Sequence, residues 1–185
     1  VKALSTTQVA GLAAADIAEM AATQLGALTT TQVAALTSTN VATLSDAQVA
    51  SFDATQLGRL TNTVVKALDT TQLSALAATQ VQAFSTSQIA AMDETDLDEF
   101  NATQVAALTT AQVRAITTTV IGAISSTAIA AFDTTQVAQL QVTQIDQLST
   151  TNLSALTSTQ LTAFTSTQVA SFSDPQLEAY LLGLG

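Results

Sequence analysis

The sequence predicts an all-α fold, a solenoid of very short capped helices with one helix in each eight-residue unit. Three observations predict it: an unbroken octapeptide repeat, a helix-capping signal in most octads, and charges placed as a helix dipole favours. The commonest residues of the octad are Val-Ala-Ala-Leu-Thr-Thr-Thr-Gln. The register runs without insertion or deletion from Val1 to the last octad, which begins at Leu177. A fixed short period indicates stacked units that contact mainly their neighbours.

The first and fourth positions of the octad carry the expected core. All 23 octads have Val, Ile or Leu at the first position, and all have Leu, Ile, Met, Phe or Tyr at the fourth. Residues three apart share one face of a helix, so each octad presents two core side chains. Because a helix this short is not stable alone, neighbouring octads must supply the core and some hydrogen-bond partners.

Each helix is expected to begin at the fifth position of one octad and to end at the fourth position of the next, over residues 5–12, 13–20 and so on to 173–180. The spacing Ser/Thr-x-x-Gln at positions five to eight is that of a capping box, in which the first side chain and the glutamine cap each other's backbone amides. The fifth position departs from Ser, Thr, Asp or Asn only at Ala13, Ala21, Ala77 and Gln141. The eighth position departs from Gln at Asp16, Asn40, Val64, Asp96, Val120, Ala128 and Asn152.

Charge placement favours helices independently of capping. Nine of the 14 acidic residues lie at positions five to eight, and the four basic residues (Lys2, Arg59, Lys66 and Arg114) all lie at positions two or three. Acids at the start of a helix and bases at its end suit the macrodipole. The alternative is a β-solenoid, which the even period and the many threonines would suit, although positions one and four would then face opposite sides. One continuous helix is excluded, because eight residues overshoot two turns by about 80°.

Two signals bear on the number of helices per coil, and they disagree. Phe52, Phe84, Phe100, Phe132, Phe164 and Tyr180 are separated by multiples of 16 residues, which favours two helices per coil. The substitutions Asp16, Asn40 and Val64 recur every 24 residues, which favours three. Two helices per coil are the expectation. Residues 1–180 are expected to form a single elongated array, and 181–185 a tail outside the repeat.

Composition excludes several classes of function. The chain has no Cys and no His, which removes disulfides, thiol catalysis, serine-histidine triads and the usual zinc ligands. Its net charge of −10 disfavours nucleic acid as a partner. No apolar stretch is long enough to cross a membrane. We therefore expect no enzyme, no cofactor and no transmembrane segment.

Two features of the octads suggest ligands. Asp93, Glu94, Asp96, Asp98 and Glu99 form the densest acidic cluster and are a candidate calcium site, although no Asp-x-Asp-x-Asp-Gly loop is present. Otherwise they are ordinary first-turn and solvent-facing acids. The threonines at positions five to seven form a regular hydroxyl array that would suit ice or a glycan, but Asp46, Glu94 and Asp174 interrupt it.

Two resemblances accompany this pattern. Residues 108–116, Leu-Thr-Thr-Ala-Gln-Val-Arg-Ala-Ile, resemble the opening helix of a transcription-activator-like effector repeat, which implies a helix here but no DNA contact, because that family's base-reading loop is absent. The whole chain resembles the Thr/Gln/Val/Leu-rich octapeptide tracts of large bacterial surface or secreted proteins. That resemblance implies a stalk, adhesin or matrix role and names no functional residue.

The expected function is therefore a non-catalytic structural spacer or adhesive stalk segment of a larger bacterial surface or secreted protein, located outside the cell or on its surface. The alternatives are a protein-binding solenoid and an ice- or glycan-binding threonine array. The expected partners are neighbouring repeats of the parent protein, a protein or glycan ligand, and a second copy associating end to end. A spacer's exposed positions should vary freely, whereas a binder should show a clustered patch; positions two and three vary along the sequence without clustering.

Overall fold

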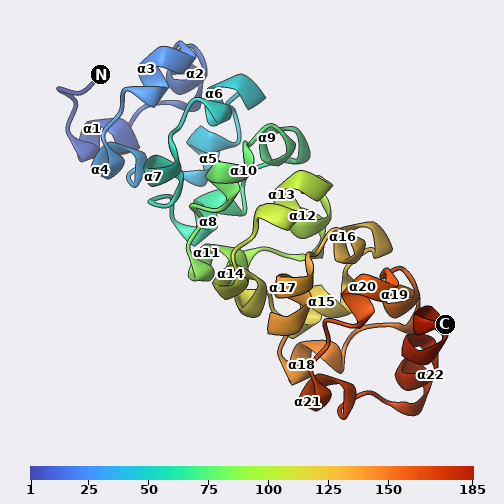
Figure 1. Cartoon of the computed structure of the whole chain (residues 1–185). Helices are drawn as coiled ribbons and strands as arrows, with labels where there is room; N and C mark the ends of the chain where they lie inside the picture. The colour runs from blue at the N-terminus through green and yellow to red at the C-terminus, as the bar shows by residue number, and fades with distance from the viewer. The chain divides into compact units, whose positions relative to one another are not determined.

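The computed structural model describes all residues, 1–185, and contains 22 helices and no strand. The predicted all-α fold is confirmed, and the β-solenoid is excluded. The chain divides into two compact units, Val1–Ala91 and Met92–Gly185. Figure 1 colours the first from blue to green and the second from green to red.

The first unit contains α1 (Thr6–Ala10), α2 (Ala14–Ala18), α3 (Ala22–Gly26), α4 (Thr30–Val33), α5 (Ser38–Val41), α6 (Asp46–Ala50), α7 (Ala54–Leu57), α8 (Asn62–Val65), α9 (Thr70–Ser74), α10 (Ala78–Val81) and α11 (Thr86–Ala91). The second unit contains α12 (Glu94–Asp98), α13 (Ala102–Ala107), α14 (Thr110–Ala115), α15 (Thr118–Ala123), α16 (Ser126–Ala130), α17 (Thr134–Gln139), α18 (Val142–Ile145), α19 (Thr150–Ser154), α20 (Ser158–Leu161), α21 (Ser166–Val169) and α22 (Asp174–Leu184).

Within each compact unit, every helix packs against the third helix along the chain. In the first unit α3 contacts α6 and α6 contacts α9, and Figure 1 shows these three helices in a row. In the second unit the same rule joins α12 to α15, α15 to α18 and α18 to α21. One coil therefore consists of three helices, and the expected two helices per coil are wrong.

The aromatic spacing failed as a signal because the fourth position accepts large rings in all three columns of helices. Phe52, Phe84 and Phe164 lie in α6–α7, α10–α11 and α20–α21 turns, one in each column, and all three are buried. The 24-residue recurrence at the eighth position was the informative signal, because that side chain contacts the preceding coil.

The helices are shorter than predicted. Helix α4, for example, ends at Val33 rather than at the fourth-position residue Leu36, whose N–H donates to the carbonyl of Val33 at 3.1 Å. The next residue, Thr37, is already extended at φ −94° and ψ 161° as the N-cap of α5. The chain thus turns within the last residues of each octad, and no residue needs a positive φ. This corner geometry explains how the repeat manages with so few glycines.

The core is formed by the two predicted positions. First-position side chains such as Val33 and Val113 are 0% exposed, and fourth-position side chains such as Leu36 and Leu108 are 3% exposed. Burial of one Val or Leu side chain contributes roughly 1.5–3 kcal/mol. Because no octad encloses its own core, this stabilisation requires the coil on either side.

Helix α22 breaks the pattern. It runs for 11 residues, from Asp174 to Leu184, because the last octad has no Ser/Thr-x-x-Gln to start a new helix. It packs on α19 and α20, and its Tyr180 ring meets Phe164 and Phe172 edge-on or tilted, at 6.2 and 5.3 Å. Residues 181–184 therefore continue the last helix.

Candidate functional site

The most regular polar arrangement of the molecule is a clamp made by the glutamine at the eighth position. In Gln72, Oε1 accepts from the N–H of the N-cap Asp69 at 2.9 Å, while Nε2 donates to the carbonyls of Val41 at 2.9 Å and Leu44 at 2.6 Å. The carbonyls lie at the end of the helix one coil earlier. We call this pair of interactions the glutamine clamp.

The clamp recurs in both compact units. Its Nε2 reaches the fourth-position carbonyl 28 residues earlier from Gln32, Gln48, Gln56, Gln72, Gln80, Gln88, Gln136, Gln144, Gln160, Gln168 and Gln176. The shorter Asn40 and Asn152 keep one such bond each, at 3.1 and 3.0 Å. The predicted capping box is confirmed. The bond to the preceding coil and the burial of the glutamine were not predicted.

Three octads lack the clamp, because Val64, Val120 and Ala128 replace the glutamine. At Ala128 a carboxylate from the preceding coil compensates: Oδ1 of Asp98 accepts from the N–H of the N-cap Ser125 at 3.1 Å. Ser125 still caps its own helix by accepting from the N–H of Ala128 at 3.2 Å. Asp98 therefore substitutes for half of a missing glutamine.

The five acidic residues of the candidate calcium site are used separately. Asp93 is the N-cap of α12 and accepts from the N–H groups of Thr95 and Asp96 at 3.1 and 3.2 Å. Asp96 is 8% exposed, and its Oδ2 accepts from the N–H of Asp93 at 3.0 Å. Asp98 binds Ser125, as described above.

The remaining two acids of that cluster, Glu94 and Glu99, lie at opposite ends of α12, in its first turn and at its C-cap. No three acidic side chains of the chain gather as a group that could hold a metal ion. The arrangement accounts for Asp93, Asp96 and Asp98 through hydrogen bonds to backbone amides.

Asp69 shows how an N-cap carboxylate is tuned. The N–H of Gln72 donates to its Oδ1 at 2.9 Å, and the hydroxyl of Thr71 donates to the same atom at 2.7 Å. These bonds, the first foremost, lower the pKa of the Asp69 carboxyl below its ordinary value, and a small desolvation effect opposes them. The charged form is the one that caps the helix.

The threonine hydroxyls divide into two groups. Fifth-position hydroxyls cap helices, as when Thr109 Oγ1 accepts from the N–H of Gln112 at 3.2 Å. Seventh-position side chains, such as Thr31 and Thr79, are exposed to solvent. The periodic hydroxyl surface therefore exists, and its binding of ice or glycan stays a prediction.

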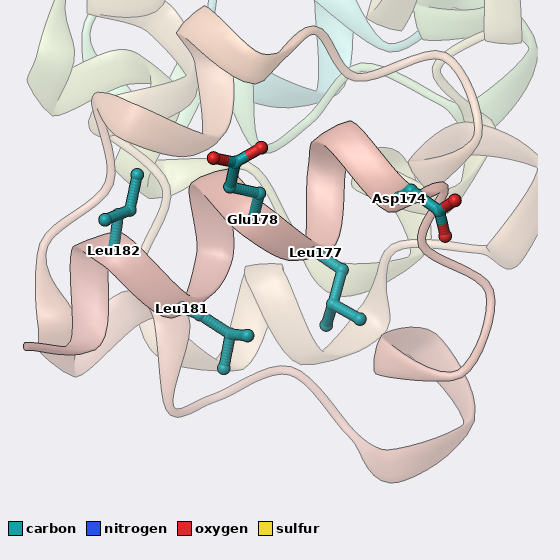
Figure 2. Close-up of a pocket in the computed structure, with 5 residues that line it drawn as sticks. All are labelled: Asp174, Leu177, Glu178, Leu181 and Leu182. Carbon is teal, nitrogen blue, oxygen red and sulfur yellow. The ribbon is translucent and has the colours of Figure 1, made fainter.

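Two hollows lie on the surface. The larger, of about 420 Å³, is lined by Asp174, Leu177, Glu178, Leu181 and Leu182 of α22 alone. Figure 2 shows Leu177 and Leu181 pointing to one side of this helix and Glu178 to the other. Leu181 is 58% and Leu182 76% exposed. End-to-end association through such a surface stays a prediction.

The smaller hollow, of about 210 Å³, is lined by residues of three successive coils in the second compact unit. Arg114 from α14, Gln139 from α17 and Val142 from α18 lie around it together with Gln141 and Thr167. We call it the Arg114 groove. None of these residues was singled out as a site by the sequence, because they are far apart along the chain.

Comparison with known families identifies the type of repeat. Residues 89–125 and 105–142 match the ALTTAQ repeat. The hexapeptide Ala-Leu-Thr-Thr-Ala-Gln itself occurs at residues 107–112, within both ALTTAQ matches. No curated protein matches the chain. The ALTTAQ matches support a repeat tract.

None of the 22 helices has the length and the hydropathy that crossing a membrane requires.

Proposed function

We propose that the chain is a non-catalytic spacer or adhesive stalk segment of a larger bacterial surface or secreted protein. The observation that carries the proposal is the use of the repeated polar groups. The hydroxyl or carboxylate at the fifth position and the amide at the eighth are engaged in holding one coil to the next. No buried side-chain nitrogen or oxygen lacks a hydrogen-bond partner. A repeat whose invariant groups all serve its own stacking suits a scaffold.

Composition supports an extracellular setting. The chain is acidic, free of cysteine and rich in threonine, as are the octapeptide tracts of bacterial surface proteins that it resembles. Antibody labelling of intact cells that make the parent protein tests the location. Labelling only after the cells are lysed would contradict it.

The spacer role is tested by changing the number of coils. Deleting residues 33–56 removes 24 residues, one coil of three octads, and preserves the register of all clamps. We expect the circular dichroism spectrum per residue to stay the same and the maximum dimension in small-angle X-ray scattering to fall. A deletion of residues 33–52, which breaks the octad register, is the matched control and should lose helicity. An unchanged dimension after the 24-residue deletion would contradict the spacer.

The rival enzyme class has its own test. A reproducible turnover that is lost on changing Asp96 or Glu99 would replace the spacer with a catalyst. A protein-binding solenoid would be indicated by a partner whose affinity depends on a cluster of exposed side chains.

A further inference from the structure

The Arg114 groove gathers residues that depart from the repeat. The second and third positions are most often Ala, but here they hold Arg114 and Gln139. The fifth position is usually Ser or Thr, but here it is Gln141, and the sixth holds Val142, larger and more apolar than any other residue at that position. In a repeat whose typical residues serve stacking, a spatial cluster of atypical residues indicates a separate role.

The clustering is a property of the coil. Arg114 lies 25 to 28 residues before the other three, so the three-helix coil brings it beside them. Nε2 of Gln141 donates to the carbonyl of Arg114 at 3.4 Å and so ties the two sides of the groove together. In the sequence alone the second and third positions vary without clustering, and only the packing of α14 beside α17 and α18 shows the patch.

Arg114 is the only basic residue of the second compact unit, which carries nine acidic residues. Its side chain is exposed, and the structure shows no carboxylate paired with it. A guanidinium presents a planar fork of donors that matches a carboxylate with two parallel hydrogen bonds. The surrounding negative charge repels polyanions in general, so binding at this point depends on short-range contacts.

The rest of the lining suits a polyol. Gln139 and Thr167 offer an amide and a hydroxyl at the rim, and Thr165 keeps its hydroxyl proton available because its Oγ1 acts as an acceptor, from the N–H of Gln168 at 3.3 Å. Val142 is 38% exposed and provides an apolar contact. On the floor, Gln168 already donates to the carbonyl of Leu140 at 2.7 Å, so the floor is satisfied without a ligand.

We propose that the Arg114 groove binds a carboxylate-bearing sugar residue, a uronate of an acidic polysaccharide. Arg114 pairs with the carboxylate, the amides and hydroxyls bind the ring hydroxyls, and Val142 contacts a carbon face of the ring. The volume of about 210 Å³ is below that of sites for drug-sized ligands, and suits a single sugar residue. An acidic peptide would need an extended groove or a free strand edge, which this compact hollow does not offer. The site adds to the spacer role and does not depend on it.

The test is a titration of the full ¹⁵N-labelled chain with trigalacturonate, followed by amide chemical shifts. We expect saturable shifts centred on Arg114, Gln139, Gln141, Val142 and Thr167, and weaker binding at higher salt. The methyl ester of trigalacturonate is the neutral control, and hexaglutamate is the peptide control. Both should bind at least about threefold more weakly, because each lacks either the carboxylates or the sugar ring.

Two variants complete the design. Arg114→Ala restores the commonest residue of its position, so we expect an unchanged melting temperature and an affinity for trigalacturonate lower by about three- to tenfold. Arg59→Ala removes the same charge from an exposed arginine in the first compact unit and should leave the affinity unchanged. Gln139→Ala, another return to the common residue, should weaken binding without altering the fold.

Several results would overturn the uronate site. Equal loss of affinity in Arg59→Ala and Arg114→Ala would mean that only net charge matters. Equal binding of the methyl ester would remove the role of Arg114, and tighter binding of hexaglutamate would indicate a peptide site. The absence of any shift would also reject the proposal, since the melting temperature shows whether each variant is folded.

Discussion

At the scale of the residue, the glutamine of the eighth position decides how octads are joined. One side chain satisfies an N-cap amide in its own octad and carbonyls at the end of a helix one coil earlier. These are groups that helix ends leave without partners. Asparagine reaches one carbonyl, and valine or alanine none, so chain length and polarity at this position set the strength of the joint.

Gln72→Val tests this joint, because Val occupies the same position at residues 64 and 120. The change leaves the Asp69 amide and the carbonyls of Val41 and Leu44 without their partner. We expect a loss of about 1–3 kcal/mol in the free energy of unfolding, measured with urea. Thr79→Ala, at an exposed position, is the control and should change stability by less than about 0.5 kcal/mol. Equal effects of the two changes would show that the clamp adds nothing.

Asp69 makes stability depend on pH. Its folded-state pKa is lowered by the amide of Gln72 and the hydroxyl of Thr71, so the unfolded state holds the proton more tightly. The stabilisation is therefore present above the unfolded pKa of about 3.9 and is lost as the pH falls through the folded value. Asn can cap the same helix without titrating.

We expect the melting temperature of the natural chain minus that of Asp69→Asn to be greater at pH 6 than at pH 2. Thermal unfolding followed by circular dichroism measures both. A difference that is independent of pH would mean that the carboxylate charge does not contribute.

At the scale of the element, every helix is too short to be stable alone, and its ends are completed by other helices. The joint between α12 and α16 shows how substitutions compensate. The helix that lost its glutamine at Ala128 receives an acceptor from Asp98, one coil earlier. The two positions should therefore be coupled in energy.

A double-mutant cycle tests this coupling. Asp98→Ala should destabilise the natural chain by about 0.5–1.5 kcal/mol through loss of the bond to Ser125. In the Ala128→Gln background the new glutamine can accept from the same amide, so the cost should fall. Asp146→Ala removes an acid from the same octad position and should have little effect in either background. Additive costs would show that Asp98 and residue 128 act independently.

At the scale of the whole molecule, stability is a sum of joints between coils, so it differs from place to place within each compact unit. In the second unit, α15, α16 and α17 stack on α12, α13 and α14. Of the three eighth-position residues in that upper coil, only Gln136 makes a clamp. The next coil has Gln144, Asn152 and Gln160, and all three bind the coil below.

We expect the amides of α15 and α16 to exchange with deuterium faster than those of α18 and α19. Hydrogen exchange read by NMR or mass spectrometry measures the difference. The double variant Val120→Gln, Ala128→Gln should slow exchange in α15 and α16 and leave α18 and α19 unchanged. Uniform exchange through the second unit would indicate that the clamps do not govern local opening.

The sequence by itself determined the helical class, the core and the caps, because these follow from local rules. Side chains three apart share a helix face, and a hydroxyl three residues before a glutamine satisfies the first amides. First- and fourth-position residues such as Val33 and Leu36 are accordingly buried as predicted. The same local rules place acids such as Asp69 at helix starts.

Only the tertiary structure decided the three-helix coil, the burial of the glutamines and the gathering of Arg114, Gln139 and Val142. Each depends on which octads lie side by side, and equivalent octads have nearly the same local sequence whichever neighbour they meet. The aromatic spacing misled because the fourth position tolerates Phe in every column. The 24-residue recurrence at the eighth position was informative because a side chain that bonds to the preceding coil depends on the period of that coil.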